Sequence, residues 1–398
     1  MKPNSISQSD RAVVQTLCRL IEFDSVSSKS NVEISDWVGN ELKRRGFAVS
    51  LQRYDDARGV AKANVIGRRL PSDSITRSND DSVGGLVYLC HTDVVPANTW
   101  TGPGPDPFVP VLQDNRLYGR GSCDMKGSLA AMLSAIDRFD ASDAAQRAPL
   151  SIIATADEEV GFDGARHVAR DASVYAEIVA EAPIAVVGEP TRLRVVHGHK
   201  GIHGFDVVSR GLAVHSSRDD GENANWNIIP VLQLIREIRE ETLRDDSMHH
   251  QAFDPQHLSW NMVVNTDCVP MNVTQGLMRV SVSYRTMPGI DGAVFAARVA
   301  EACKARDLDF VAMPGCDPVL NEVDNVAVKT MLEICQQESS HTVCYGTDGG
   351  IFFRDLPNMV VCGPGDIAQA HKTDEWICLD QLAAGVDVYE RAIHRCCA

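Results

Sequence analysis

The sequence lacks the features that would indicate a membrane-bound, secreted or nucleic-acid-binding protein. Its 398 residues contain no run of eighteen apolar residues, and the N-terminal segment MKPNSISQSD is too polar for the apolar core of a signal peptide. Basic residues are scarce. The 38 Lys and Arg stand against 54 Asp and Glu, giving a net charge of −16 that repels phosphate backbones and anionic lipid. We therefore expect a cytoplasmic protein with no nucleic-acid or membrane partner.

Cysteine is present but lacks the spacing of a disulfide framework. Twelve cysteines are spread irregularly along the chain, and no C-x-x-C pair occurs. Cys90 and Cys362 lie in apolar runs, where a reduced cysteine behaves as a small hydrophobic residue. We expect reduced, structural thiols, with Cys396 and Cys397 as candidate reactive thiols.

Several common catalytic motifs are also absent. The chain has no G-x-S-x-G, no H-E-x-x-H and no G-x-x-x-x-G-K-[ST], and no G-x-G-x-x-G follows an expected strand. The main signatures of serine hydrolases, single-motif zinc peptidases and nucleotide-binding proteins are therefore missing.

Apolar periodicity predicts an α/β domain in the first half of the chain. Residues 10–23 and 32–46 carry apolar side chains at helical spacing, and a further helix is expected from Asp124 to about Phe139. Short, continuous apolar runs are typical of buried parallel strands, and they occur at 85–90, 150–155 and 184–187.

The middle of the chain has a different pattern, with the order β-α-β-β-α-β. Its expected strands and helices lie at 203–209, 223–245, 258–265, 277–285, 292–306 and 308–312. This order is that of a ferredoxin-like module, which is a complete two-layer unit. We expect this module, at 192–312, to be inserted in a discontinuous α/β domain made of 1–191 and 313–398, with a mostly parallel mixed sheet. Residues 71–83 are expected to form a loop.

Histidines and carboxylates occur where expected strands end or helices begin. His91 and Asp93 follow a strand and point the same way on an extended chain, so one could bind a metal while the other orients it. A strand-end histidine beside a capping aspartate is the alternative. Asp124 stands at a helix start, where an N-cap is the alternative.

Three more segments extend this pattern. The adjacent Glu158 and Glu159 follow a strand, and their carboxylates repel each other unless a cation or a proton lies between them. Glu189 ends another strand, and His371 follows the apolar run 359–362. Imidazole and carboxylate ligands suit a catalytic zinc or cobalt site, and two such metals sharing one carboxylate would make a hydrolytic centre.

Several strings in this sequence resemble one enzyme family over nearly the whole chain. They are HTDVVPA, the W-x-G-P-x-P-D-P-F pattern, GRGSCDMKG, ATADEEVG, VGEPT and QAHKTDEW. The chain is similar to the dinuclear zinc amidohydrolases of family M20, which include acetylornithine deacetylase, succinyl-diaminopimelate desuccinylase and the glutamate carboxypeptidases. The resemblance implies a metallopeptidase-like catalytic domain, and it implies that the inserted module is a dimerisation or lid domain.

The resemblance also implies roles for individual residues. Each subunit would bind two Zn²⁺ ions, which Co²⁺ can replace. Asp124 would bridge the two ions. His91 and Glu189 would complete one site, and Glu159 and His371 the other. Asp93 would support His91, and Glu158 would be the general base that takes a proton from water and passes it to the leaving nitrogen.

The inserted module supplies three further candidates through the same resemblance. His215 is similar to a lid histidine that reaches the active site of the neighbouring subunit in a homodimer. Asn272 and Arg285 resemble residues that bind a substrate carboxylate, for which a guanidinium group is well shaped. A turn histidine and an exposed strand arginine are the alternatives. The segment MNVTQG departs from the family pattern because it lacks the usual proline after Asn272.

Three further strings look most like those of acetylornithine deacetylase. They are GTDGG at 346–350, CGPGDIAQAH at 362–371 and RTMPG at 285–289. The expected reaction is therefore removal of an acetyl group from N2-acetyl-L-ornithine in arginine biosynthesis. The alternatives are an acetylcitrulline deacetylase, a succinyl-diaminopimelate desuccinylase, a dipeptidase or carboxypeptidase, and a metal-binding protein without catalysis.

Overall fold

The computed structural model describes residues 8–71, 84–267 and 269–398. Two compact units divide the chain, and each is described by itself below. Unit 1 comprises Met1–Gly198, Leu320–His341 and Thr347–Ala398, and unit 2 comprises His199–Val319 and Thr342–Gly346. The boundaries expected from the sequence were 191/192 and 312/313. The segment 71–83, expected to be a loop, falls outside the described residues except for Pro71.

Unit 1 alternates helices and strands along the chain. Up to the end of β8 its elements are α1 (Gln8–Ile21), α2 (Val32–Arg44), β1 (Ala48–Asp55), β2 (Ala61–Arg69), β3 (Leu86–His91), β4 (Val111–Gln113), β5 (Arg116–Tyr118), α3 (Lys126–Asp140), β6 (Leu150–Thr155), η1 (Glu158–Val160), α4 (Asp163–Asp171), α5 (Ser173–Ala180), β7 (Ile184–Pro190) and β8 (Val196–His199). After the inserted segment they are β13 (Val319–Leu320), α8 (Val326–Cys335), β14 (His341–Val343), α9 (Gly349–Phe352), β15 (Met359–Gly363), η3 (Ile367–Gln369), β16 (Trp376–Cys378) and α10 (Leu379–Cys397).

A large mixed sheet forms the centre of unit 1. Its strand order is β1-β2-β6-β3-β7-β15-β8-β13, with β14 paired to β8. The four central strands β6, β3, β7 and β15 are mutually parallel and buried along their whole length. Parallel strands covered on both faces are continuously apolar, which explains why their sequences lack alternation.

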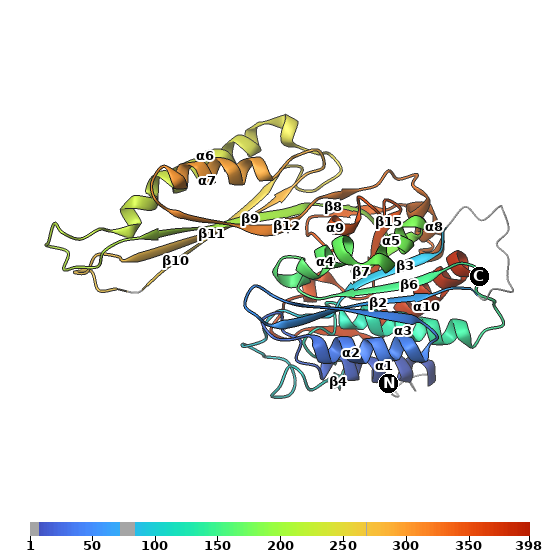
Figure 1. Ribbon diagram of the computed structural model, residues 1–398. Helices are drawn as coiled ribbons and strands as arrows, with labels where there is room; N and C mark the ends of the chain where they lie inside the picture. Colours follow the sequence, from blue (N-terminus) through green and yellow to red (C-terminus); the bar gives the residue numbers. More distant parts are fainter. Residues whose placement is uncertain (1–7, 72–83, 268) are drawn as a thin grey trace. The chain divides into compact units, whose positions relative to one another are not determined.

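Helices cover both faces of this sheet. Figure 1 shows α1, α2, α3 and α10 on one face, with α4 and α5 on the other. The main hydrophobic core lies between the first face and its helices, and it includes Leu17, Val38, Tyr88, Met132 and Tyr389.

The helix α3 packs tightly against the central strands. A Cβ atom at Gly188 of β7 would lie 2.3 Å from the Tyr88 hydroxyl and 2.5 Å from Ser128 Oγ, so only glycine allows this approach. The Ser128 hydroxyl lies 2.7 Å from the hydroxyls of both Tyr88 and Tyr389. These buried hydroxyl groups therefore satisfy one another, as burial of polar groups requires.

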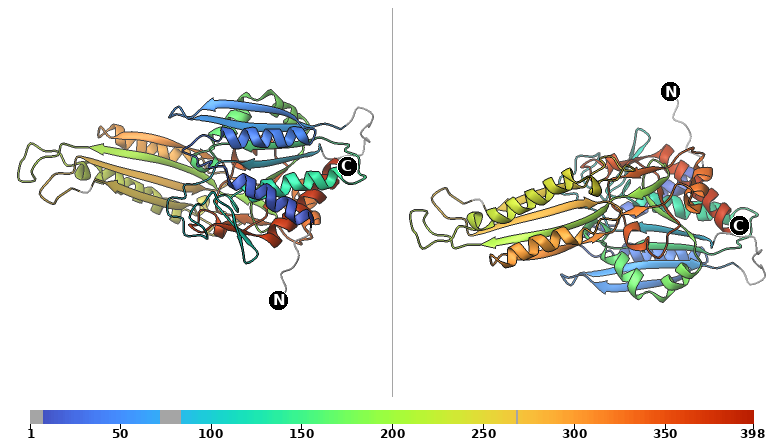
Figure 2. Two further views of the ribbon diagram at one scale, coloured as in Figure 1. Left: turned by 90° about the horizontal axis from the view of Figure 1, so that it is seen from below. Right: turned by 90° about the horizontal axis from the view of Figure 1, so that it is seen from above.

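Unit 2 is the β-α-β-β-α-β module that the sequence predicts. Its elements are β9 (Gly201–Arg210), α6 (Ala224–Arg244), η2 (Asp246–Met248), β10 (Ser259–Thr266), β11 (Leu277–Thr286), α7 (Ala293–Lys304) and β12 (Asp309–Cys316). They form an antiparallel sheet of order β10-β11-β9-β12, the strand order of ferredoxin-like modules. Figure 2 shows both helices along this sheet from two further directions.

The structure also differs from the sequence expectations in several places. The hairpin of β1 and β2 and the helices α4 and α5 were not expected. Cys396 and Cys397 are buried, and burial raises the pKa of Cys396 to about 12. Reactive cysteines are accessible and have a lowered pKa, so these thiols do not fit the reactive role considered for them. Within the described residues, no helix combines the length and the apolarity needed to cross a membrane.

Candidate metal centre

Parallel strands bring several chemistry-bearing residues to one edge of the large sheet. β3 ends at His91, β6 is followed by the short turn with Glu158 and Glu159, and Glu189 is the penultimate residue of β7. β3 pairs in parallel with both β6 and β7, so the carboxyl ends of the three strands meet. This edge is where α/β sheets bind their ligands.

Asp124 lies between two histidines in this region. Its Oδ1 atom is 3.2 Å from His91 Nε2, and its Oδ2 atom is 3.4 Å from His371 Nε2. His91 Nε2 is also 3.6 Å from Glu189 Oε1, and His371 Nε2 is 3.0 Å from Glu159 Oε2. The five side chains thus form two groups, each with one histidine and one glutamate, that share a single aspartate.

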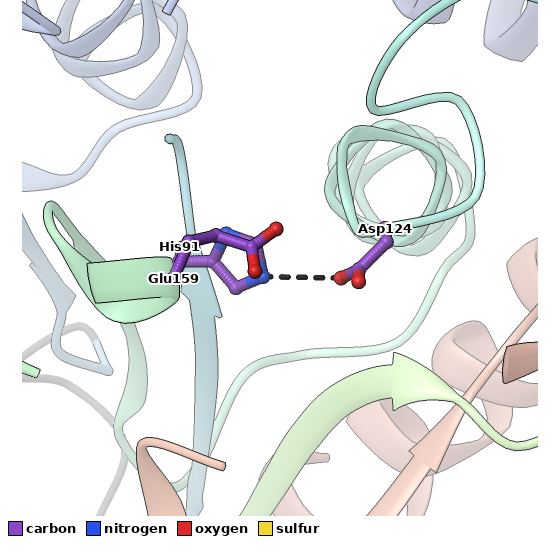
Figure 3. Close-up of side chains that lie close together, drawn as sticks. All are labelled: His91, Asp124 and Glu159. Atoms are coloured by element: carbon purple, nitrogen blue, oxygen red, sulfur yellow. Dashed lines mark hydrogen bonds and ion pairs between the residues drawn. The ribbon is translucent and has the colours of Figure 1, made fainter. Parts of the chain in front are cut away.

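Three of these residues are close enough to hold one metal ion. The ligand atoms of His91, Asp124 and Glu159 all lie within 4.8 Å of one another. Figure 3 shows the His91 ring directed at the Asp124 carboxylate, with Glu159 beside it. Glu159 Oε1 is buried and has no hydrogen-bond partner among the described residues. Imidazole and carboxylate donors around an unsatisfied buried oxygen fit a divalent cation.

Burial makes the negative charge of this cluster costly. Burial raises the pKa values of Glu158, Glu159 and Glu189 above their usual range, and the neighbouring carboxylates raise them further. Hydrogen bonds to Asp124 and Glu159 raise the pKa of His371 to about 10. A divalent cation between these groups would relieve the repulsion among the acids.

Comparisons with known proteins identify the family of this chain. The sequence matches the profile of Peptidase family M20/M25/M40 over residues 87–395. The chain belongs to this family. It is 30% identical to an acetylornithine deacetylase of Myxococcus xanthus over 399 residues, covering 97% of this chain and 98% of that one. It is also 30% identical to an acetylornithine deacetylase of Vibrio campbellii, covering 95% and 97% of the two chains.

Several solved structures share the fold at low sequence identity. An M20 family metallo-carboxypeptidase from Sulfolobus solfataricus has a TM-score of 0.72 at 15% identity, covering 96% of this chain and 98% of that one. Human carnosine dipeptidase 1 has a TM-score of 0.71 at 16% identity, covering 98% and 97%. A Bacillus subtilis M20 protein described as a dinuclear metal binding peptidase has a TM-score of 0.61 at 13% identity, covering 97% and 98%. These structures show the fold, while the family match and the relatives at 30% identity show a metal-dependent hydrolase that acts on amide bonds.

In this M20 hydrolase, Asp93 contacts His91 through its main-chain oxygen and, at a longer distance, through its carboxylate. His91 Nδ1 lies 2.9 Å from the main-chain oxygen of Asp93, whereas the Asp93 carboxylate is 3.7 Å away. The carboxylate instead accepts hydrogen bonds from the main-chain N–H groups of Glu158 and Glu159, at 3.1 and 3.4 Å, and from Ser27 Oγ at 2.7 Å. The support of His91 by Asp93 stays a prediction: the Asp93 carboxylate lies within ion-pair distance of His91, and it also holds the turn that carries both glutamates.

The candidate residues of the inserted module do not form one group. Ser216 N–H donates to the main-chain oxygen of Asn272 at 2.8 Å, so the segments of His215 and Asn272 are adjacent and exposed. Arg285 is the penultimate residue of β11, while Asn272 precedes the first residue of that strand. Strand rise separates Leu277, the first residue of β11, from Arg285 by roughly 26 Å. Asn272 and Arg285 of one chain therefore cannot hold the same small carboxylate, contrary to the sequence expectation.

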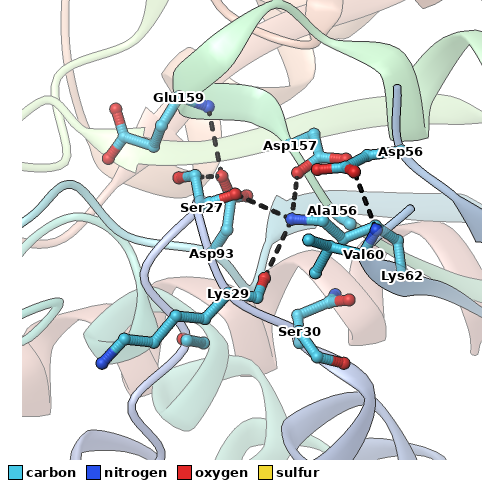
Figure 4. Close-up of polar contacts among 12 residues, drawn as sticks. Ser27, Lys29, Ser30, Asp56, Val60, Lys62, Asp93, Ala156, Asp157 and Glu159 are labelled. Atoms are coloured by element: carbon cyan, nitrogen blue, oxygen red, sulfur yellow. Dashed lines mark hydrogen bonds and ion pairs between the residues drawn. The ribbon is translucent and has the colours of Figure 1, made fainter. Parts of the chain in front are cut away.

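Sequence reasoning missed a buried ion pair beneath the turn at Glu158. Lys62 is fully buried, and its Nζ atom lies 2.6 Å from Asp157 Oδ1. It also donates to the main-chain oxygens of Ser27 and Lys29, at 2.8 and 2.9 Å (Figure 4). The available signal was a lysine between two alanines, shortly before Val65 and Ile66, because a charge in a buried strand requires a partner.

Two buried carboxylates near the candidate ligands were also missed. Asp348 accepts a hydrogen bond from Thr155 Oγ1, and burial raises the pKa of Asp348 to about 7. Glu375 lies in the string around His371 and is 1% exposed. No spacing rule distinguishes Glu375 from the neighbouring Asp374, since only the folded chain shows which of the two is buried.

The Lys62–Asp157 pair predicts a large loss of stability when one partner is removed. Replacing Lys62→Met leaves the Asp157 carboxylate buried without its cation, which costs about 3–5 kcal/mol. Urea unfolding followed by circular dichroism measures this change. The control is Lys29→Met, whose ammonium group pairs with Asp24 while 58% exposed, and it should change stability far less. Equal, small effects of the two substitutions would contradict a structural role for the buried pair.

Proposed function

We propose that this hydrolase removes the acetyl group from N2-acetyl-L-ornithine, releasing L-ornithine and acetate as a step of arginine biosynthesis. Two M20 relatives at 30% identity over nearly the full chain carry the name acetylornithine deacetylase. The strings around 346–350, 362–371 and 285–289 support the same substrate class. The cytoplasmic location expected from the sequence remains a prediction.

The observation that carries the proposal is the shared position of Asp124. One carboxylate oxygen faces His91 and the other faces His371, with Glu189 on the first side and Glu159 on the second. We therefore assign one cation to His91 and Glu189, the other to Glu159 and His371, and the bridge to Asp124. Zn²⁺ is the proposed ion, with Co²⁺ as a substitute. Two bound cations would lower the pKa of a water molecule and polarise the scissile carbonyl.

Glu158 is the proposed general base of this reaction. Its main-chain N–H donates a hydrogen bond to the Asp93 carboxylate, and its side chain is buried. It is also adjacent in sequence to the proposed ligand Glu159. A carboxylate in this position can take the proton of the attacking water and pass it to the leaving nitrogen. The proton that leaves the attacking water thus ends on the amide nitrogen, which departs as a neutral amine.

The inserted module is proposed to dimerise and to complete the site of the neighbouring subunit. β10 is an edge strand of its sheet, and Met262, Val263 and Val264 on it are 48, 46 and 46% exposed. An exposed apolar edge strand pairs readily with another chain. In such a homodimer, His215 would donate a hydrogen bond to the developing oxyanion, with Asn272 beside it, and Arg285 would bind the substrate carboxylate separately.

The substrate assignment predicts turnover of N2-acetylornithine by the zinc- or cobalt-loaded protein. Acetate release should be faster with this compound than with acetylcitrulline, succinyl-diaminopimelate or a dipeptide panel, compared as kcat/KM. A higher kcat/KM for one of the other compounds would replace the proposed substrate. No turnover of any of them, with both cations measured in the protein, would favour a binding protein that has lost catalysis.

The role of Glu158 predicts that chemistry and metal binding can be separated. Glu158→Gln should retain both cations by elemental analysis but lose about 10²- to 10⁴-fold in kcat, because the proton acceptor is removed. Glu159→Gln is the matched comparison, since it should lose one cation as well as activity. Unchanged kcat in the Glu158→Gln protein would remove this residue from the mechanism.

A histidine that acts across a dimer predicts rescue in mixed assemblies. His215→Ala and Glu158→Gln should each be nearly inactive. Random re-pairing of the two should restore up to about a quarter of wild-type activity, because half of the dimers are then mixed and each mixed dimer has one intact site. If His215 acts within its own chain, neither site of a mixed dimer is intact, and the absence of rescue would contradict the arrangement.

A further inference from the structure

A buried carboxylate that the proposed mechanism does not use lies next to the metal centre. Glu375 is four residues after His371 and is 1% exposed. Its Oε1 atom accepts from the main-chain N–H groups of Cys123 and Asp124, at 2.9 and 3.0 Å. Its Oε2 atom accepts from the N–H of Gly121 at 3.0 Å and from Arg120 Nη1 at 2.6 Å. Four donors thus converge on one side chain.

These contacts hold the loop that carries Asp124. Successive main-chain N–H groups turned toward one point make a concave anion site, and here the anion is a side chain of the same protein. Gly121 has φ +83°, and a Cβ atom there would lie 2.8 Å from Val94 Cγ1, so the loop conformation requires glycine. The main chain at Asp124 is therefore held directly by Glu375.

Arg120 extends the same contact to the segment of His371. Its Nη2 atom donates to the main-chain oxygens of Lys372 and Pro96, at 3.0 and 3.3 Å, while Nη1 binds Glu375. The main chain adds a further link, because Gly119 N–H donates to the Glu375 carbonyl at 3.1 Å. The loop of Asp124 and the loop of His371 are thus joined through Glu375 and Arg120.

The five proposed ligands do not depend equally on this link. The side chains of His91 and Glu189 are 1% and 7% exposed, and both belong to central strands of the sheet. The side chain of His371 is 55% exposed and lies in a segment without helix or strand. His371 therefore relies on local anchors, whereas His91 and Glu189 rely on the sheet.

We propose that Glu375 is a positioning residue that holds Asp124 and His371 in register and so determines the affinity for the cation assigned to Glu159 and His371. The inference rests on the proposed two-cation site and adds a residue that touches neither ion. It predicts an unequal effect: loosening the link weakens the second cation more than the first, because the second has both Asp124 and His371 held by this link, whereas the first shares only Asp124 and keeps His91 and Glu189 on the sheet.

Cobalt titration of the apoprotein tests this proposal without an activity assay. Wild-type protein, stripped with a chelator, should bind two equivalents of Co²⁺, followed by calorimetry and by the visible absorption of the bound ion. Glu375→Gln should keep the first equivalent and bind the second about ten- to a hundredfold more weakly, the loss typical when a partner of a metal ligand is changed. The absorption of the second equivalent should also change, because its ligand geometry is altered.

A second variant separates positioning from simple charge. Arg120→Lys keeps the positive charge beside Glu375, but an ammonium group cannot reproduce the guanidinium fork that also reaches Lys372 and Pro96. Positioning predicts a weaker second cation in this variant too, whereas a purely electrostatic effect predicts no change. The matched control is Glu41→Gln in α2, which removes a buried carboxylate bound to Arg45 at 2.8 Å and should leave both equivalents unchanged.

The outcomes distinguish this inference from the proposed function. A wild-type protein that binds no Co²⁺ overturns the two-cation site itself. The role of Glu375 is overturned if the wild-type protein binds two equivalents of Co²⁺ and Glu375→Gln binds both as tightly. It is also overturned if Glu375→Gln loses affinity for both equivalents equally while its melting temperature is unchanged. Where Glu375→Gln melts below the assay temperature, the milder Arg120→Lys decides in the same way.

Discussion

The structure of this M20 hydrolase depends on the crowding of buried negative charge at one edge of its central sheet. Asp124, Glu159 and Glu189 lie there against the imidazoles of His91 and His371, and Glu158 is buried beside them. Carboxylates removed from water are costly unless a cation or a hydrogen-bond donor compensates them. The parallel strands impose this crowding, because their carboxyl ends cannot be moved apart without breaking the sheet.

Two further buried carboxylates are compensated by hydrogen-bond donors. Asp93 accepts from the main-chain N–H groups of Glu158 and Glu159, and Glu375 accepts from those of Cys123 and Asp124. In each case the carboxylate is satisfied by main-chain donors, so it needs no metal ion. Each carboxylate also fixes the main chain at a proposed metal ligand, Glu159 in one case and Asp124 in the other. Both acids therefore help to position the ligands.

The strands that end at the site could be predicted from the sequence because their signals are local. Continuous apolar runs at 85–90 and 150–155 became β3 and β6, and the histidine and carboxylates after such runs were found at the same sheet edge. The hairpin of β1 and β2 was missed because β1 is an edge strand of mostly half-buried and exposed residues, which gives no continuous apolar run.

Contacts between distant segments could not be predicted in this way. The Asp93 carboxylate binds a turn 65 residues later, and Glu375 binds a loop more than 250 residues earlier. The short interval from Asn272 to Arg285 was misleading because residues that are close in sequence can lie far apart in space. Thirteen residues suggest proximity, but an extended strand converts most of that interval into length.

This strand length also constrains how the inserted module can contribute to catalysis. A small acyl-amino acid spans only a fraction of the roughly 26 Å between Arg285 and Leu277 at the start of β11. His215 and Asn272 lie together beyond one end, and Arg285 lies near the other. One substrate can contact both groups only if they come from different chains. A twofold contact through β10 would supply such a second chain, because it presents the same edge of the module from each subunit. The proposed dimer would thus reconcile the positions of the proposed substrate residues, and this argument for it holds only while all three of them belong to the mechanism.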